Sequence, residues 1–238
     1  MHYPKQETIA VVLIYIFMLA GGLWHALDIL QAEMRLLASP MIIGLGLLLF
    51  GDYLRNLHFE KTNSKAPGEG LNAKQAARRF VVWSILVVLF GFLIELAGVK
   101  TGVVFGRYRY GGTLQPALAE VPLAIGFAWL AMLLCSGALT ARVLSHVKTP
   151  NLVLQAGVIA GFMLLFDFFM EPAAMKLNYW QWQDGAVPPR NYLAWFVTGY
   201  ALAFSGLRTQ FWRAQTSIIS VHAYIAQLGY FSIVNLAK

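Results

Sequence analysis

Long, uninterrupted runs of apolar residues dominate the chain, and short polar stretches separate them. Most runs are about as long as the helix of roughly 20 residues that crosses a bilayer core of about 30 Å. Apolar and polar positions do not alternate along them, so the strands of a membrane β-barrel are not expected. The pattern predicts an all-α, polytopic membrane helix bundle of about seven transmembrane helices in a single domain, residues 1–238. The expected spans lie near residues 8–24, 36–54, 80–99, 121–140, 152–170, 192–207 and 217–237.

The composition supports a membrane protein and argues against two other classes. Hydrophobic residues make up 58% of the chain and charged residues only 12%, which is not typical of a soluble domain. The net charge of +7 does not indicate a nucleic-acid partner, because the basic residues lie between the apolar runs. The one cysteine, Cys135, lies inside an apolar span, so neither an internal disulfide nor a cysteine-rich metal site is expected.

The distribution of Lys and Arg predicts the orientation in the membrane. These residues are more numerous on the side that holds the N-terminus, mainly because of the segment from Arg55 to Arg79 between the second and third spans. The positive-inside rule therefore favours a cytoplasmic N-terminus. We expect this segment to be a solvated connection close to anionic lipid.

The candidate catalytic residues are expected at one side of the membrane. The C-terminal ends of the third and fifth spans and the N-terminal ends of the fourth and sixth spans all face that side. Four carboxylates are expected there, at Glu95, Glu120, Asp167 and Glu171. Carboxylates inside a span are costly and usually functional. Aromatic and amide side chains of the same end complete the candidate site: Tyr110, Trp129, Tyr179, Trp180, Trp182, Asn191 and Trp195.

Helix position separates the expected roles of these acids. Asp167 and Glu171 are four residues apart and share a helix face, and Pro172 is expected to end that helix. The helix dipole disfavours an anion at such an end, and a neutral carboxyl in a dry site is what a general acid requires. Asp167, the deepest, is the first candidate for the proton donor. Glu120, just before Pro122, is expected in the first turn of the fourth helix, paired with Arg107 or Arg109.

Simpler alternatives exist for most of these residues. The acids would merely fix the loops if they paired with basic residues of the same end, which are Arg107, Arg109, Lys176 and Arg190. Trp180 and Trp182 would be interfacial anchors. The histidines are scattered without metal-ligand spacing, so no metal is expected. A retinal protein is excluded because residues 217–237 hold no lysine for a Schiff base. The run from Gly157 to Gly161 is expected to be a helix-packing motif.

Several motifs of this end together resemble one family. They are E-L-x-G-x-x-x-G-x-x-F-G-x-Y-x-Y (residues 95–110), E-V-P-L-x-I-x-F-A-W (120–129), D-x-x-x-E-P (167–172), Y-W-x-W (179–182) and P-x-N-Y-x-x-W-F (189–196). The set resembles the integral-membrane carotenoid biosynthesis family, whose characterised members are carotenoid 1,2-hydratases of bacteria and haloarchaea. The resemblance covers roughly residues 75–210.

The resemblance implies a multi-pass enzyme of the bacterial inner membrane that hydrates the terminal C1=C2 double bond of an acyclic ψ end group. Its substrate would be a lipid-soluble carotenoid such as γ-carotene or lycopene, and neither metal nor redox cofactor would be needed. The reaction needs a proton donor, for which Asp167 is the candidate, and shelter for a tertiary carbocation. The resemblance leaves open whether other enzymes of the pathway bind the chain.

The other candidates then take supporting roles. Glu171 and Glu95 would hold or activate water, with Tyr110 and Asn191 ordering it. Aromatic faces, each worth about 0.5–2 kcal/mol to a cation, would stabilise the intermediate. These faces belong to Trp129, Tyr179, Trp180, Trp182 and Trp195.

Two other functions fit parts of the same pattern. A proton-triggered carotenoid or terpenoid cyclase would form the same cation and quench it with an internal alkene, so its product would keep the substrate's mass. A membrane transporter or lipid-binding protein would use acids to relay protons, and its ionisable residues should extend through the depth of the bundle. Here the acids gather at one end, which speaks against a relay, whereas only the product mass separates the hydratase from the cyclase.

Overall fold

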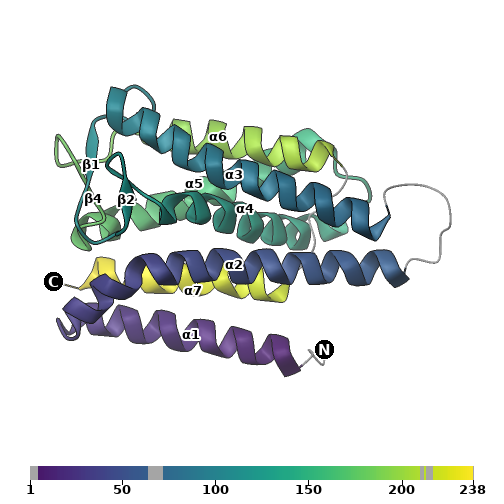
Figure 1. Ribbon diagram of the computed structural model, residues 1–238, viewed down its shortest axis with the longest axis horizontal. Helices are drawn as coiled ribbons and strands as arrows, with labels where there is room; N and C mark the ends of the chain where they lie inside the picture. The colour runs from purple at the N-terminus through teal and green to yellow at the C-terminus, as the bar shows by residue number, and fades with distance from the viewer. Residues whose placement is uncertain (1–4, 64–71, 210–211, 213–216, 238) are drawn as a thin grey trace.

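The computed structural model describes residues 5–63, 72–209, 212 and 217–237, and within them the chain is a helix bundle (Figure 1). Its helices are α1 (Lys5–Ala26), α2 (Gln31–Asn63), α3 (Ala73–Thr101), α4 (Ala124–Val143), α5 (Leu152–Lys176), α6 (Pro189–Arg208) and α7 (Ile218–Leu236), with a 3-10 turn, η1 (Leu144–His146), after α4. Two short antiparallel ribbons lie at one end, β1 (Tyr108–Tyr110) with β4 (Trp180–Trp182) and β2 (Ala117–Leu118) with β3 (Val121–Pro122). The predicted all-α class is confirmed.

Six of the described helices are long and apolar enough to cross a membrane, namely α1 to α5 and α7. α6 is more polar, because Arg190, Asn191, Thr198 and Ser205 interrupt its apolar residues. α4 lies at the centre of the bundle and contacts α2, α3, α5 and α7, whereas α1 packs mainly on α7. Cys135 of α4 is a fully buried free thiol, as its apolar surroundings in the sequence predict.

The helices extend further than the apolar runs predict. α2 continues to Asn63 and α3 begins at Ala73, so much of the expected loop between residues 55 and 79 is helical, and residues 64–71 lie outside the described part. The capping box formed by Asn72 and Gln75 explains where α3 begins: the Asn72 side chain accepts from the Gln75 amide at 2.8 Å.

Pro172 does not end the fifth helix, and that prediction is wrong. It lies inside α5, which continues to Lys176. The last turn is held by its surroundings, since Ala173 and Ala174 are fully buried and their carbonyls accept from the amides of Leu177 and Tyr179, each at 2.9 Å. A helix interior that loses one backbone hydrogen bond to proline is tolerated where neighbouring helices support it.

Two glycines in membrane helices have opposite environments, and this gives the first testable prediction. A Cβ on Gly126 of α4 would lie 2.4 Å from the carbonyl oxygen of Val88 on α3, whereas one on Gly157 of α5 would meet no atom within 4 Å. Gly126→Ala should destabilise the protein by about 1–3 kcal/mol through overpacking. Gly157→Ala should stabilise it by up to about 1 kcal/mol, since alanine is the better helix former.

Thermal unfolding of the two variants in detergent checks this pair, and equal midpoints would contradict it. Within the run from Gly157 to Gly161 the two glycines make no close contact, because a Cβ on either would meet nothing. The run packs through Ala160, which is fully buried and whose Cα would lie 3.7 Å from a Cβ on Gly199 of α6.

Candidate functional site

The ribbon of β1 and β4 brings four aromatic donors to one face. Its register pairs Tyr108 with Trp182 and Tyr110 with Trp180. Side chains alternate along a strand, so these four share one face while the Arg109 side of the ribbon points away. Trp180 and Trp182 are buried, whereas Arg109 is exposed. Two sequence segments about 70 residues apart thus form a single aromatic cover over the end of the bundle (Figure 1).

Glu95 of α3 is the centre of the first acid cluster. Its Oε2 accepts hydrogen bonds from the hydroxyls of Tyr108 at 2.5 Å and Tyr110 at 2.9 Å, and its Oε1 accepts from the Trp129 indole at 3.1 Å. The carboxyl is buried. Burial, and then the Glu95 carboxylate, raise the pKa of both tyrosines, so their hydroxyls keep their protons and serve as donors.

Glu171 of α5 is the centre of the second cluster. Its Oε2 accepts from the indoles of Trp180 at 2.9 Å and Trp182 at 2.8 Å. Its Oε1 accepts from the Asn191 amide of α6 at 3.1 Å, and the same amide nitrogen donates to Asp167 Oδ2 at 2.8 Å. Asn191 therefore joins the two carboxyls that the spacing of four residues places on one face of α5.

Asp167 is the most enclosed of the three acids. Its side chain is fully buried, and within the described residues its second oxygen, Oδ1, has no hydrogen-bond partner. An unpaired acceptor in such a place costs about 1–3 kcal/mol. A protonated carboxyl has fewer acceptor sites to satisfy than a carboxylate, so this environment suits the neutral form.

Neutral donors, not cations, hold these acids. In the part of the chain that the structure describes, no Lys, Arg or His lies within ion-pair distance of Glu95, Asp167 or Glu171. Lys176 instead donates to carbonyls at the end of α7, at 2.8 Å for Asn235, and Arg190 donates to the Val103 carbonyl at 3.3 Å. The simpler alternative, in which loop cations neutralise the acids, does not describe this site.

Glu120 lies apart from the site, and its predicted position is wrong. Leu118 pairs with Val121, so Ala119 and Glu120 form a two-residue hairpin turn with φ of 51° and 74°. Two positive φ values are those of a type I′ turn, which is the favoured two-residue connection. α4 begins only at Ala124, and the exposed Glu120 pairs with Lys100 at 2.8 Å rather than with Arg107 or Arg109.

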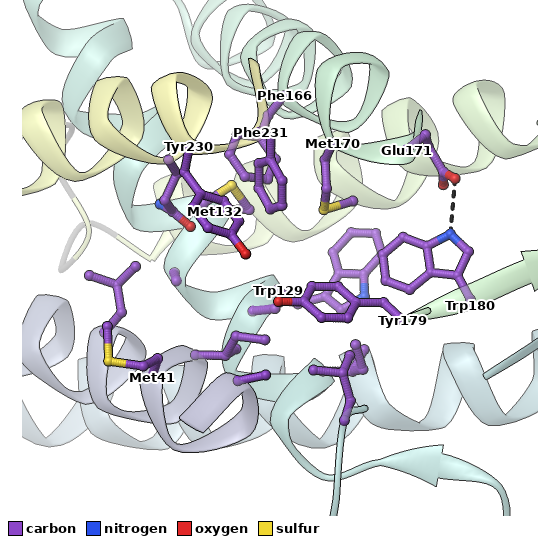
Figure 2. A pocket seen from close by; sticks show the side chains of 18 of the residues that line it. Met41, Trp129, Met132, Phe166, Met170, Glu171, Tyr179, Trp180, Tyr230 and Phe231 are labelled. Atoms are coloured by element: carbon purple, nitrogen blue, oxygen red, sulfur yellow. Dashed lines mark hydrogen bonds between the residues drawn. The ribbon is translucent and has the colours of Figure 1, made fainter. Parts of the chain in front are cut away.

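A largely apolar cavity of about 190 Å³ reaches both clusters. Figure 2 shows Glu171 and Trp180 of the second cluster on its wall. Glu95 and Glu171 line it, whereas Asp167 and Glu120 do not. The other predicted residues all line it: Tyr110, Trp129, Tyr179, Trp180, Trp182, Asn191 and Trp195. Trp129 and Trp195 form a stacked pair there, with ring centroids 4.2 Å apart and an interplanar angle of 16°. Glu95 and Glu171 thus line the cavity together with these aromatic side chains.

The two N-terminal helices form the opposite wall, which the sequence analysis missed. α1 and α2 contribute apolar side chains to it, among them Phe17, Met18, Met34, Ala38, Met41 and Leu45. Phe17 and Leu37 line the cavity and are also 55% and 51% exposed on the outer surface. α1 and α2 make few contacts with each other. The cavity therefore borders the lipid-facing surface between these helices.

The sequence carries one local signal for the aromatic cover formed by β1 and β4. Y-R-Y at residues 108–110 and W-Q-W at residues 180–182 each alternate aromatic and polar positions, which is the period of a strand. The α1–α2 wall carried no comparable signal, because lipid-facing and cavity-facing apolar residues look alike in a sequence.

Apolar helices that can span a bilayer, around an apolar cavity that ends at buried carboxyl groups, define an integral membrane protein of the helix-bundle class. The chain belongs to the carotenoid biosynthesis protein family, whose model matches residues 70–237.

Among characterised proteins the chain is similar to the bisanhydrobacterioruberin hydratase of Haloarcula japonica, with 28% identity over 199 residues. The match covers 82% of this chain but only 62% of that protein's length. No solved structure matches the chain significantly.

Proposed function

We propose that the protein is a carotenoid hydratase that adds water across the terminal C1=C2 double bond of an acyclic ψ end group. The observation that carries the proposal is the apolar cavity that ends at two buried carboxyls, each held by three neutral donors. Family membership and the similarity to a hydratase support the same reaction class.

The shape of the cavity suits one end of a linear polyene. The α2 residues that line it run from Met34 to Leu45, which corresponds to about 16 Å along the helix axis at 1.5 Å per residue. A linear carotene is about as long as the bilayer core of roughly 30 Å. The cavity would hold about half of the molecule with the end group at the acids. The remainder would extend into lipid between α1 and α2, so one end reacts at a time.

Glu171 is the carboxyl that we assign to the proton transfer. Asp167, the first candidate from the sequence, does not line the cavity, whereas Glu171 does and is joined to it through Asn191. Two charges in one buried pocket repel each other, so at most one of the two carboxyls is charged at a time. With Asp167 neutral, only Glu171 becomes a carboxylate, when it has given up its proton. Asp167 and Asn191 therefore act as positioning residues for Glu171.

The steps balance with a single water. Glu171 gives its proton to C2, and the π electrons of the double bond form the new C–H bond. C1 becomes a tertiary cation, to which the oxygen of one water molecule adds. The proton released from that water goes to the Glu171 carboxylate, which restores the starting state. C1 gains a hydroxyl and C2 gains a hydrogen, and no oxidant or reductant is needed.

The remaining residues shelter the cation and hold the water. The stacked Trp129 and Trp195 present aromatic faces, each worth about 0.5–2 kcal/mol to a nearby cation. The phenolic oxygens of Tyr108 and Tyr110, whose protons are directed to Glu95, are free to accept hydrogen bonds from a water molecule.

In this proposal the chain lies in a bacterial inner membrane with its N-terminus in the cytoplasm. The acid site then lies at the periplasmic end of the bundle, where the C-termini of α1, α3, α5 and α7 are found. Membrane lipid surrounds the mouth between α1 and α2, from which a lipid-soluble substrate enters.

Co-expression in a bacterial host that makes lycopene or γ-carotene tests this function. The expected pigment has the mass of the substrate plus one water, and heavy oxygen from labelled water appears in it. A new pigment of unchanged mass would replace the hydratase with a cyclase. Unaltered pigments from both hosts, with the protein present in the membrane, would overturn the proposal.

A further inference from the structure

A second group of polar side chains lines the cavity and takes no part in the steps above. It consists of His25 of α1, Tyr179 after α5, and Gln227 and Tyr230 of α7. All four lie outside the two acid clusters. Polar groups are costly in an apolar membrane cavity, so their presence on its wall requires an explanation.

These side chains form a path from the end of the bundle to the acids. Figure 2 shows the hydroxyls of Tyr230 and Tyr179 directed toward each other inside the cavity. The His25 ring packs edge-on against the Tyr230 ring with centroids 6.1 Å apart. The Tyr179 ring lies 6.2 Å from that of Trp180, which donates to Glu171.

The outer end of the path reaches the exposed turn between α1 and α2, at the end of the bundle. His25 lies in the last turn of α1, and its Nδ1 is 3.1 Å from Oε1 of Gln31, the first residue of α2. His25 is only half-buried, and the turn between the two helices, residues 27–30, is exposed. The mouth toward lipid has no such groups, since apolar side chains such as Phe17 and Leu37 border it.

We propose that this polar branch is a water site and entry path that supplies the water added to the carotenoid, separate from the apolar mouth that admits the carotenoid. Its phenol, imidazole and amide groups offer the two to four partners that a buried water needs. The cavity of about 190 Å³ is far larger than the roughly 10–15 Å³ that one water requires. This inference rests on the proposed hydration.

The products that the cation forms show directly how well water reaches the site. A cation that meets water becomes the alcohol, whereas a cation that does not returns a proton to the Glu171 carboxylate and regenerates the alkene. In D2O the donor carries deuterium, so each abortive cycle can leave deuterium at C2 of the recovered substrate. The ratio of deuterated substrate to hydrated product therefore measures how well water reaches C1, independently of the overall rate.

Tyr230→Phe and His25→Phe should each raise this ratio by about fivefold, since each removes one hydrogen-bonding group from the path. Tyr224→Phe is the matched control: it lies on the same helix, is buried, and loses a hydrogen bond of 2.8 Å to the Phe162 carbonyl, but it does not line the cavity. It should leave the ratio at the wild-type value.

The inference is overturned if Tyr230→Phe or His25→Phe keeps the wild-type ratio, or if Tyr224→Phe raises the ratio equally. If Tyr230→Phe does not accumulate in membranes, Tyr179→Phe removes the hydroxyl that faces Tyr230 in the same cavity and must meet the same expectation. A wild-type protein that forms no hydrated product at all removes the proposed function, and the water path with it.

Discussion

Replacing Glu171 by glutamine is expected to lower the rate of carotenoid hydration by about 10²–10⁴-fold, the usual contribution of a positioned general acid. The amide keeps the size of the side chain and an oxygen that accepts from the indoles of Trp180 and Trp182. It has no proton acidic enough to protonate an alkene. The measurement is the rate of product formation in membranes that contain equal amounts of each variant.

Glu120→Gln is the matched control for this prediction. Glu120 is an acid of the same end of the bundle, but it is exposed and bound to Lys100, and exposed ion pairs contribute little. Its variant should hydrate at the wild-type rate. Wild-type hydration by Glu171→Gln would contradict the assignment of the donor.

Asp167→Asn separates the donor from its neighbour. Because Asp167 does not line the cavity, its loss should reduce the rate by only about tenfold, through the altered hydrogen bonding of Asn191. A larger loss in Asp167→Asn than in Glu171→Gln would reverse the two roles and restore the assignment that the sequence alone favours.

The prediction of the fold from the sequence succeeded where the signal is local. Membrane-spanning helices show themselves as continuous apolar runs, so their existence and order could be predicted. Helix ends were predicted less well, because tertiary contacts decide them. α5 continues past Pro172 because buried neighbours hold its last turn. α4 begins after a hairpin that no apolar pattern marks.

In the candidate site, too, local contacts could be predicted from the sequence and long-range contacts could not. Asp167 and Glu171 are four residues apart, so their shared face followed from helical periodicity. The hydrogen-bond donors of Glu95 are 13, 15 and 34 residues away along the chain, at Tyr108, Tyr110 and Trp129. Only the folded ribbon and the packing of α3 on α4 bring them together.

The position of the cavity was also beyond reach from the sequence. Its acid end was expected from the helix ends that meet on one side of the membrane, but its apolar wall on α1 and α2 was not. Residues 17–45 lie outside the span of the family model, which begins at residue 70. If this wall holds the polyene, the length and breadth of accepted substrates depend on the part of the chain that the family model does not match.

Ala38→Phe tests that wall and is expected to reduce hydration of a long carotene by at least about tenfold, a factor typical of a filled apolar pocket. Ala38 lies on α2 among the cavity-lining residues and is 9% exposed. A phenyl ring at this position would project into the cavity beside α2, where the polyene would otherwise lie. The protein should remain folded, because the ring enters existing space, and thermal unfolding in detergent checks this.

Two comparisons make the prediction specific. Leu36→Phe places the same ring two residues away at a position that is 77% exposed, and it should leave hydration unchanged. A short acyclic terpene with the same ψ end group does not reach Ala38, so Ala38→Phe should hydrate it nearly as well as the wild type does. A loss that is equal for the short and the long substrate would place the damage at the acid site, and an unimpaired rate with the long carotene would show that the polyene lies elsewhere.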